Sequence, residues 1–186
     1  MAFIETGMEG LKVFEPKIWG DARGYFFESY NAEVFKENGI DTVFVQDNQS
    51  RSTRGVLRGL HYQLPPFTQA KLVRCTHGKV LDVVVDIREG SRTYGQSFCL
   101  ILSAYNKRQL FVPQGFAHGF VVLSKEAEFF YKCDNVYSRT HEAGIAYNDS
   151  QLKIDWQIPF SEMILSEKDK VNPLLGQHLK LIMNEK

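Results

Sequence analysis

Short apolar runs separated by turn residues recur along most of this chain, and residues 79–87 show the pattern most clearly. There, Leu81, Val83, Val85 and Ile87 fall on one face with a period of two, as in a β-strand. The same reasoning predicts further strands at 43–50, 55–63, 71–75, 96–102, 109–112, 119–123 and 128–133. Many short strands at even spacing predict an all-β sandwich or barrel. A jelly roll fits well, because two packed sheets leave an open mouth for a ligand.

Helix signals are rare. Asn31 is a good N-cap for a short helix through Asn38, with Gly39 at its left-handed end, and a short helix or turn is expected after Ser166. No repeat or linker divides the chain, so we expect one domain over residues 1–186. The tail at about 173–186 is apolar enough to dock on the body through Leu174, Leu175, Leu179, Leu181 and Ile182.

Composition narrows the class of protein. The 186 residues carry 22 basic and 22 acidic side chains, and this balance argues against nucleic acid or anionic lipid as a partner. The uncharged stretch around 110–124 is too short for a membrane span of about 20 residues, and the N-terminus has no secretory signal pattern. Three cysteines without a C-x-x-C pair are interpreted as reduced, buried thiols in a cytoplasmic protein: Cys75, Cys99 and Cys133.

Two short motifs carry histidines that are candidates for chemistry. In the first, strict alternation puts Arg58 and His61 on opposite faces of a strand, unless Gly59 introduces a bulge. In the second, the turn at 113–115 delivers His118 to the mouth of a sandwich. Each motif also has a simple structural interpretation, because a strand with an incidental histidine and a proline-glycine turn are both common.

Three other residues have ordinary structural explanations when taken alone. Lys71 fits a solvated strand edge, Tyr131 fits a core aromatic, and Asp169 fits a weak capping box with Ser166. The histidines do not form the cluster of two close imidazoles and a carboxylate that a metal-binding barrel of this type would show. We therefore predict a site without a metal.

Taken together, the motifs resemble the dTDP-4-dehydrorhamnose 3,5-epimerase family. The resemblance runs in unbroken order over about residues 10–170, through segments 46–50, 55–63, 71–74, 85–88, 113–120, 134–138, 142–145 and 165–169. It implies a metal-free, cupin-type jelly roll that works as a homodimer and needs no cofactor. It also implies conversion of dTDP-4-dehydro-6-deoxy-D-glucose to dTDP-4-dehydro-L-rhamnose, a step in nucleotide-sugar supply for bacterial surface polysaccharides.

The resemblance also implies residue roles. His61 matches the general base, Tyr131 the opposing proton donor, Asp169 the carboxylate that orients the base, and Lys71 the cation near the ketone oxygen. The residues that match substrate contacts, some of them donated across the dimer, are Arg23, Phe26, Glu28, Gln46, Asn48, Arg58, His118, Tyr137, Glu142 and Lys168. The chain departs from the family pattern at Gln49, where histidine is frequent, and at Tyr147, where tryptophan is frequent.

Three alternatives remain open at the level of sequence. A related enzyme could invert only C3 or only C5 of a 4-keto nucleotide sugar with the same motifs around the base. A non-catalytic sugar-binding jelly roll would not need His61, Tyr131, Asp169 and Lys71 together. A metal-dependent cupin oxygenase would need the ligand cluster that the sequence lacks.

Overall fold

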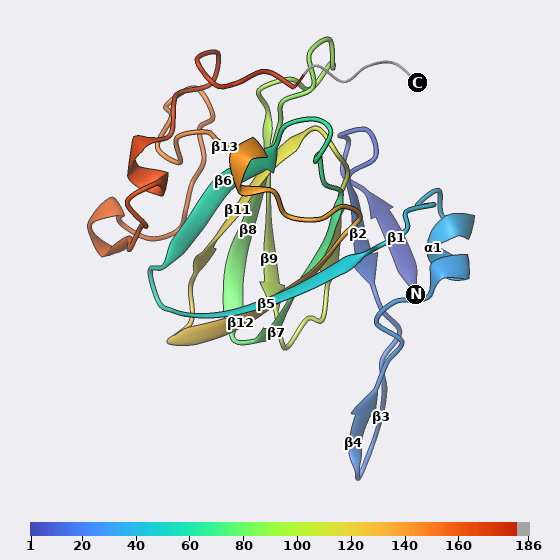
Figure 1. Cartoon of the computed structure of the whole chain (residues 1–186). Coiled ribbons are helices and arrows are strands. Elements are labelled where there is room, and N and C mark those ends of the chain that lie inside the picture. Colours follow the sequence, from blue (N-terminus) through green and yellow to red (C-terminus); the bar gives the residue numbers. More distant parts are fainter. Residues whose placement is uncertain (182–186) are drawn as a thin grey trace.

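The computed structural model describes residues 1–181, which form two antiparallel sheets packed face to face (Figure 1). The six-stranded sheet has the order β1-β2-β10-β7-β12-β5, and the five-stranded sheet has the order β13-β6-β11-β8-β9. The first sheet consists of β1 (Ala2–Glu5), β2 (Lys12–Glu15), β10 (Gln109–Val112), β7 (Lys71–His77), β12 (Glu126–Cys133) and β5 (Gln46–Thr53). The second consists of β13 (Glu142–Gly144), β6 (Leu57–Gln63), β11 (Phe116–Val122), β8 (Lys79–Asp86) and β9 (Ser97–Ser103). The predicted all-β sandwich is confirmed.

The remaining elements are short. A hairpin of β3 (Trp19–Asp21) and β4 (Gly24–Phe26) forms an arm that extends away from both sheets (Figure 1). The predicted helix is α1 (Ala32–Glu37), where the Asn31 side chain accepts hydrogen bonds from the first-turn amides and Gly39 has a φ of +81°. Single 3-10 turns lie at η1 (Arg139–His141), η2 (Phe160–Glu162) and η3 (Asp169–Val171).

Several strand limits differ from the predictions. β5 begins at Gln46 rather than at 43, and β11 begins at Phe116 rather than at 119, because Phe116 already pairs with Asp86 of β8. The patterns at β1, β2 and β13 were too short to predict. Cys75 and Cys133 are buried as expected, but the prediction was wrong for Cys99, which is exposed on β9 at the edge of its sheet.

The core lies on both faces of the five-stranded sheet. Val80 and Val84 of β8 point between the sheets, whereas Leu81, Val83 and Val85 point outward. That outer face is covered by the C-terminal segment, which packs Ile145, Leu152, Trp156 and Leu181 onto it. In the tail, Leu175 contacts this layer, Leu174 and Leu179 are exposed, and Ile182 lies outside the described residues. The predicted apolar face of β8 is therefore buried under the later part of the chain.

A bulge in β6 decides which side chains face the space between the sheets. His61 pairs with His118 and Arg58 pairs with Phe120, so β6 uses one residue more than β11 over this stretch. Gly59 absorbs the extra residue with a φ of +141°. Arg58 and His61 consequently line the same cavity, as the bulge hypothesis predicted.

The bulge brings two backbones unusually close together. A Cβ atom on Gly119 would lie 2.6 Å from the carbonyl oxygen of Arg58 and 2.9 Å from the Cα atom of Gly59. These atoms belong to the main chain and cannot move aside without shifting the strand. Glycine is therefore required on both strands at this crossing.

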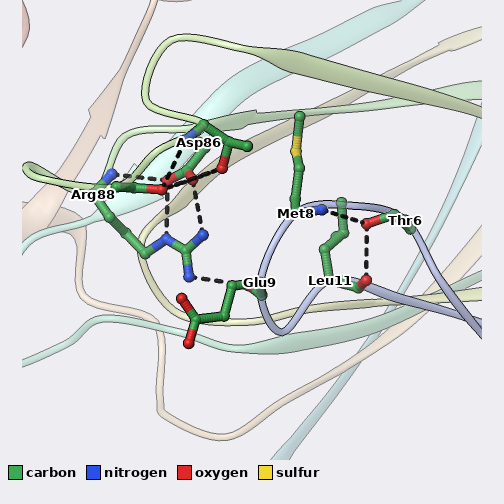
Figure 2. A network of polar contacts seen from close by, with 8 residues as sticks. Thr6, Met8, Glu9, Leu11, Asp86 and Arg88 are labelled. Atoms are coloured by element: carbon green, nitrogen blue, oxygen red, sulfur yellow. Dashed lines mark hydrogen bonds and ion pairs between the residues drawn. The ribbon is translucent and has the colours of Figure 1, made fainter.

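An ion pair between Arg88 and the buried Asp86 joins the N-terminal loop to the five-stranded sheet (Figure 2). Arg88 donates to both carboxylate oxygens of Asp86 at 2.9 and 2.8 Å, and to the carbonyl of Glu9 at 3.0 Å. Asp86 is fully buried; burial opposes its ionisation, but these bonds and those of two hydroxyls hold its pKa below the usual value. The Arg88 guanidinium also stacks 4.5 Å from the ring centroid of Phe116. The network thus ties the N-terminal loop and the end of β8 to the start of β11.

We predict that Gly119→Ala lowers the free energy of unfolding by about 2–3 kcal/mol, because a methyl group there overpacks a main-chain contact. Turnover should fall as well, since Arg58 and His61 shift together. Denaturant unfolding measures the first effect, with Gly20→Ala as control, because a Cβ at Gly20 meets nothing closer than 3.6 Å. Equal stability of the two variants would refute the close-approach argument.

Candidate active site

A cavity of about 540 Å³ opens between the two sheets and contains most of the predicted site residues. The predicted residues that line it are Arg58, His61, Lys71, His118, Tyr131, Tyr137, Glu142, Lys168 and Asp169. Sequence reasoning missed other lining residues, among them Ser50, Phe120, Phe129 and Leu165, because nothing in a local pattern separates them from ordinary core positions.

His61 and Asp169 form a hydrogen-bonded pair in this cavity. The distance from His61 Nε2 to Asp169 Oδ1 is 2.5 Å, and the carboxylate is 3% exposed. Ser166 Oγ donates to the other carboxylate oxygen at 2.8 Å, so the Ser-x-x-Asp turn fixes Asp169 locally. Burial opposes ionisation of Asp169, but the bond and charge of His61, with Ser166 and Lys168, hold its pKa below the usual value. Asp169 is therefore ionised at neutral pH and faces the imidazole.

A second contact holds the Asp169 turn against the strand of His61. β13 pairs with β6 so that Gly144 lies opposite His61. Glu142 of β13 accepts a hydrogen bond from Lys168 Nζ at 2.6 Å. Since Lys168 directly precedes Asp169, this ion pair joins the late segment to the sheet beside the base candidate.

Lys71 and Tyr131 enter the cavity from the opposite sheet. Lys71 begins β7 and Tyr131 lies on β12, with the ammonium 6.0 Å from the centroid of the Tyr131 ring. Burial lowers the pKa of Lys71, and the negative groups Asp82 and Glu142 oppose that shift through space. Burial raises the pKa of Tyr131, against the charge of Arg58. The site thus has a lysine whose pKa is lowered by burial and a protonated phenol, both facing the imidazole across the cavity.

His118 is held by a partner that sequence reasoning missed. Its Nε2 lies 2.9 Å from Oδ2 of Asp82, which is fully buried and whose Oδ1 has no partner within residues 1–181. The signal was a lone Asp in the apolar run of β8, on the face opposite Leu81 and Val83. This pair is a second His-Asp pair beside Lys71.

Polar and charged side chains lie near the opening of the cavity. Arg58 donates through Nε and one terminal nitrogen to Ser52 Oγ, both at 3.2 Å, which ties β6 to β5. The Tyr137 hydroxyl donates to Glu142 at 3.1 Å. Gln46 and Asn48, on β5, do not line the cavity; Gln46 donates to Asn48 at 3.0 Å.

Three further predicted residues lie away from the cavity of their own chain, on or beside the β3–β4 arm. Arg23 and Phe26 are exposed on the β3–β4 arm, where Arg23 pairs with Asp21 at 2.5 Å, and Glu28 follows at the base of the arm. Arg23 and Phe26 line a separate shallow cavity on the arm. A single chain therefore does not bring them to His61.

The described part of the chain contains no group of three His, Cys, Asp or Glu side chains placed to hold a metal ion. The absence of a metal remains a prediction. None of the helices within residues 1–181 has the length and apolar character to cross a membrane.

Comparison with known proteins identifies the family to which this chain is similar. The family model for dTDP-4-dehydrorhamnose 3,5-epimerase matches residues 5–177. The enzyme of that name from Shigella flexneri is 55% identical over 170 residues, covering 91% of this chain and 93% of that protein.

Solved structures agree. The dTDP-4-dehydrorhamnose 3,5-epimerase of Elizabethkingia anophelis superposes with a TM-score of 0.91 at 51% identity, covering 95% of this chain and 97% of that one. The Legionella pneumophila dTDP-6-deoxy-D-glucose-3,5-epimerase, solved in complex with dTDP-4-keto-L-rhamnose, gives 0.91 at 52% identity, with 95% and 93% coverage. The fold is that of these cupin-type epimerases, and the chain belongs to the dTDP-4-dehydrorhamnose 3,5-epimerase family.

Proposed function

We propose that this chain inverts C3 and C5 of dTDP-4-dehydro-6-deoxy-D-glucose to give dTDP-4-dehydro-L-rhamnose, with His61 as base and Tyr131 as acid. The observation that carries the assignment of roles is that the two residues come from opposite sheets and line one cavity. A sugar ring between the sheets then presents one face to the imidazole and the other to the phenol. Inversion needs that arrangement, whereas a binding module does not.

The chemistry begins with the acidity of the C–H bonds beside the C4 ketone. His61 removes the proton, since an imidazole is the side chain most often used as a general base. Asp169 occupies Nε2, so Nδ1 is the nitrogen that receives the proton, and the carboxylate stabilises the imidazolium. The electron pair of the broken C–H bond moves into an enolate at C4.

Lys71 faces the developing enolate oxygen with a positive charge that water does not screen. A preorganised stabiliser of this kind is typically worth about 3 kcal/mol in the barrier. Tyr131 returns a proton to the opposite face of the carbanion, and its raised pKa keeps the phenol protonated until that step. His118, held by Asp82, contacts the sugar beside Lys71. The reaction moves protons alone and has no net oxidation, so we propose that no cofactor takes part.

The nucleotide lies toward the rim. Arg58 and Lys168 pair with the pyrophosphate, and a guanidinium suits two phosphate oxygens at once. Tyr137 borders the base, with Gln46 and Asn48 behind it. We place the enzyme in the cytoplasm, since its three unpaired thiols suit a reducing compartment.

We also propose that the working unit is a homodimer. The exposed Phe26, Tyr25 and Trp19 of the arm need a covering surface, and a second copy of this chain supplies it. The arm then carries Arg23, Phe26 and Glu28 to the nucleotide in the partner's cavity.

His61→Asn should lower kcat by about 10³-fold, because general base catalysis typically contributes about 10²–10⁴-fold. Asp169→Asn should cost about 10²-fold, since an imidazole without its carboxylate keeps some basicity. Steady-state kinetics with the dTDP sugar measures both effects, and circular dichroism checks the fold. Wild-type turnover in His61→Asn would refute the assignment of the base.

Turnover in heavy water separates this reaction from its alternatives. Tyr131 delivers the new proton and exchanges its hydroxyl proton with solvent between steps, so a 3,5-epimerase should place deuterium at both C3 and C5. A single-centre epimerase would invert one carbon, and a binding module would label neither above background. Tyr131→Phe should still exchange protons through His61 but form product poorly. Full inversion of both centres by Tyr131→Phe at the wild-type rate would show that another group is the acid.

Mixing two inactive variants tests the exchange of arms. Because His61 serves its own cavity and Arg23 serves the partner's, a mixed dimer of His61→Asn and Arg23→Ala contains one intact site. Random reassociation makes half the dimers mixed, so activity should recover to about a quarter of wild type. Mixing His61→Asn with Tyr131→Phe is the control, because both affect the same cavity and each mixed site keeps one defect. No recovery in the first mixture, with dimers shown by light scattering, would exclude arm exchange.

A further inference from the structure

Gln63 is the last residue of β6, two positions after His61 and on the same face of the strand. It is 5% exposed and does not line the cavity, yet all of its amide groups are bonded to loops at the rim. Nε2 donates to the carbonyl of Phe67 at 2.6 Å and to that of Val136 at 3.2 Å. Oε1 accepts from the amide N–H of Ser138 at 2.7 Å.

Two of these bonds are made to Val136 and Ser138, the residues directly before and after Tyr137. The amide N–H of Tyr137 itself donates to Oε1 of Gln46 at 3.0 Å. Side-chain amides therefore hold the main chain at three successive residues of a segment that belongs to neither sheet. The Tyr137 hydroxyl is bonded to Glu142, so the direction of the side chain is set as well.

The ring of Tyr137 is nevertheless 52% exposed at the rim of the cavity. An exposed aromatic ring on an ordinary loop loses conformational entropy when a ligand orders it. A ring on a main chain that is already held binds a flat ligand without that cost. The supporting bonds also connect the ring to the strand that carries His61, which fixes the distance between the two ends of the site.

We propose that Gln63 is a positioning residue for nucleotide binding, which holds Tyr137 as a preformed platform for the base in register with His61. The inference rests on the proposed function in that the ligand is a nucleotide sugar. Gln63 acts through Tyr137 and contacts neither the sugar nor the pyrophosphate. Its removal should therefore weaken recognition of the nucleoside and leave the proton transfers unchanged.

The test uses Gln63→Met, which keeps the length of the side chain and removes its hydrogen bonds. We expect KM for the dTDP sugar to rise about tenfold and kcat to stay within about twofold of wild type. Competitive inhibition by dTDP should weaken by the same factor. Inhibition by inorganic pyrophosphate should not change, because Arg58 and Lys168 meet that group.

Asp149→Leu is the matched control for a general loss of stability. Asp149 is 4% exposed and, like Gln63, holds loop main chain, accepting from the amides of Gln151 at 2.9 Å and Leu175 at 2.7 Å. It lies outside the cavity, so Asp149→Leu should lower the melting temperature and leave KM and dTDP inhibition unchanged. An equal rise of KM in both variants, or equal weakening of dTDP and pyrophosphate inhibition in Gln63→Met, would overturn the proposal.

A double-mutant cycle with Tyr137→Ala decides whether Gln63 acts through that ring. If it does, the double variant should bind dTDP no more weakly than Tyr137→Ala alone. Additive losses would show that Gln63 acts by another route. Gln63→Leu also removes the hydrogen bonds without adding a charge and should show the same rise of KM at unchanged kcat, which keeps the test available if Gln63→Met folds poorly. Failure of the wild-type chain to turn over the dTDP sugar would instead contradict the proposed function.

Discussion

The contact between the main chains of Gly59 and Gly119 is the constraint on which the site depends. With no side chain on either residue, β6 and β11 approach closely enough for β6 to carry an extra residue while the strands stay paired on both sides. That extra residue turns Arg58 to the same side as His61. Without it, the pyrophosphate-binding candidate and the base candidate would lie on opposite faces of the sheet, and one of them would point into the C-terminal layer.

The candidate site residues are distributed over both sheets. The five-stranded sheet carries His61 and His118, each hydrogen-bonded to a buried carboxylate, and the six-stranded sheet carries Lys71 and Tyr131. Burial shifts the pKa values of these side chains in different directions. It lowers the pKa of Lys71 and raises that of Tyr131, while the hydrogen bonds of Asp169 outweigh its burial and keep it ionised. A ligand between the sheets therefore lies with His61 on one side and with Lys71 and Tyr131 on the other.

The late part of the chain completes the site as well as the core. It covers the outer face of the five-stranded sheet with Leu152, Trp156 and Leu181, and this packing brings the Ser166–Asp169 turn to the cavity. The ion pair of Glu142 and Lys168 and the amide bonds of Gln63 then join the rim loops to β6 and β13. The same layer thus contributes to stability and supplies the carboxylate that is hydrogen-bonded to His61.

The sequence alone was enough for the strand-rich class, the α1 cap at Asn31, the apolar face of β8 and the family, because these depend on local periodicity, local turn chemistry and motifs in order along the chain. It could also propose a bulge at Gly59, since glycine between two functional residues of a strand is a local signal. The partnership of Asp82 with His118, the exposure of Cys99 and the support of Tyr137 by Gln63 were decided by tertiary structure. The first and the last join residues that are distant along the chain, and the exposure of Cys99 follows from the place of β9 at the edge of its sheet. A local pattern does not state which strand lies opposite another or which loop covers a strand end.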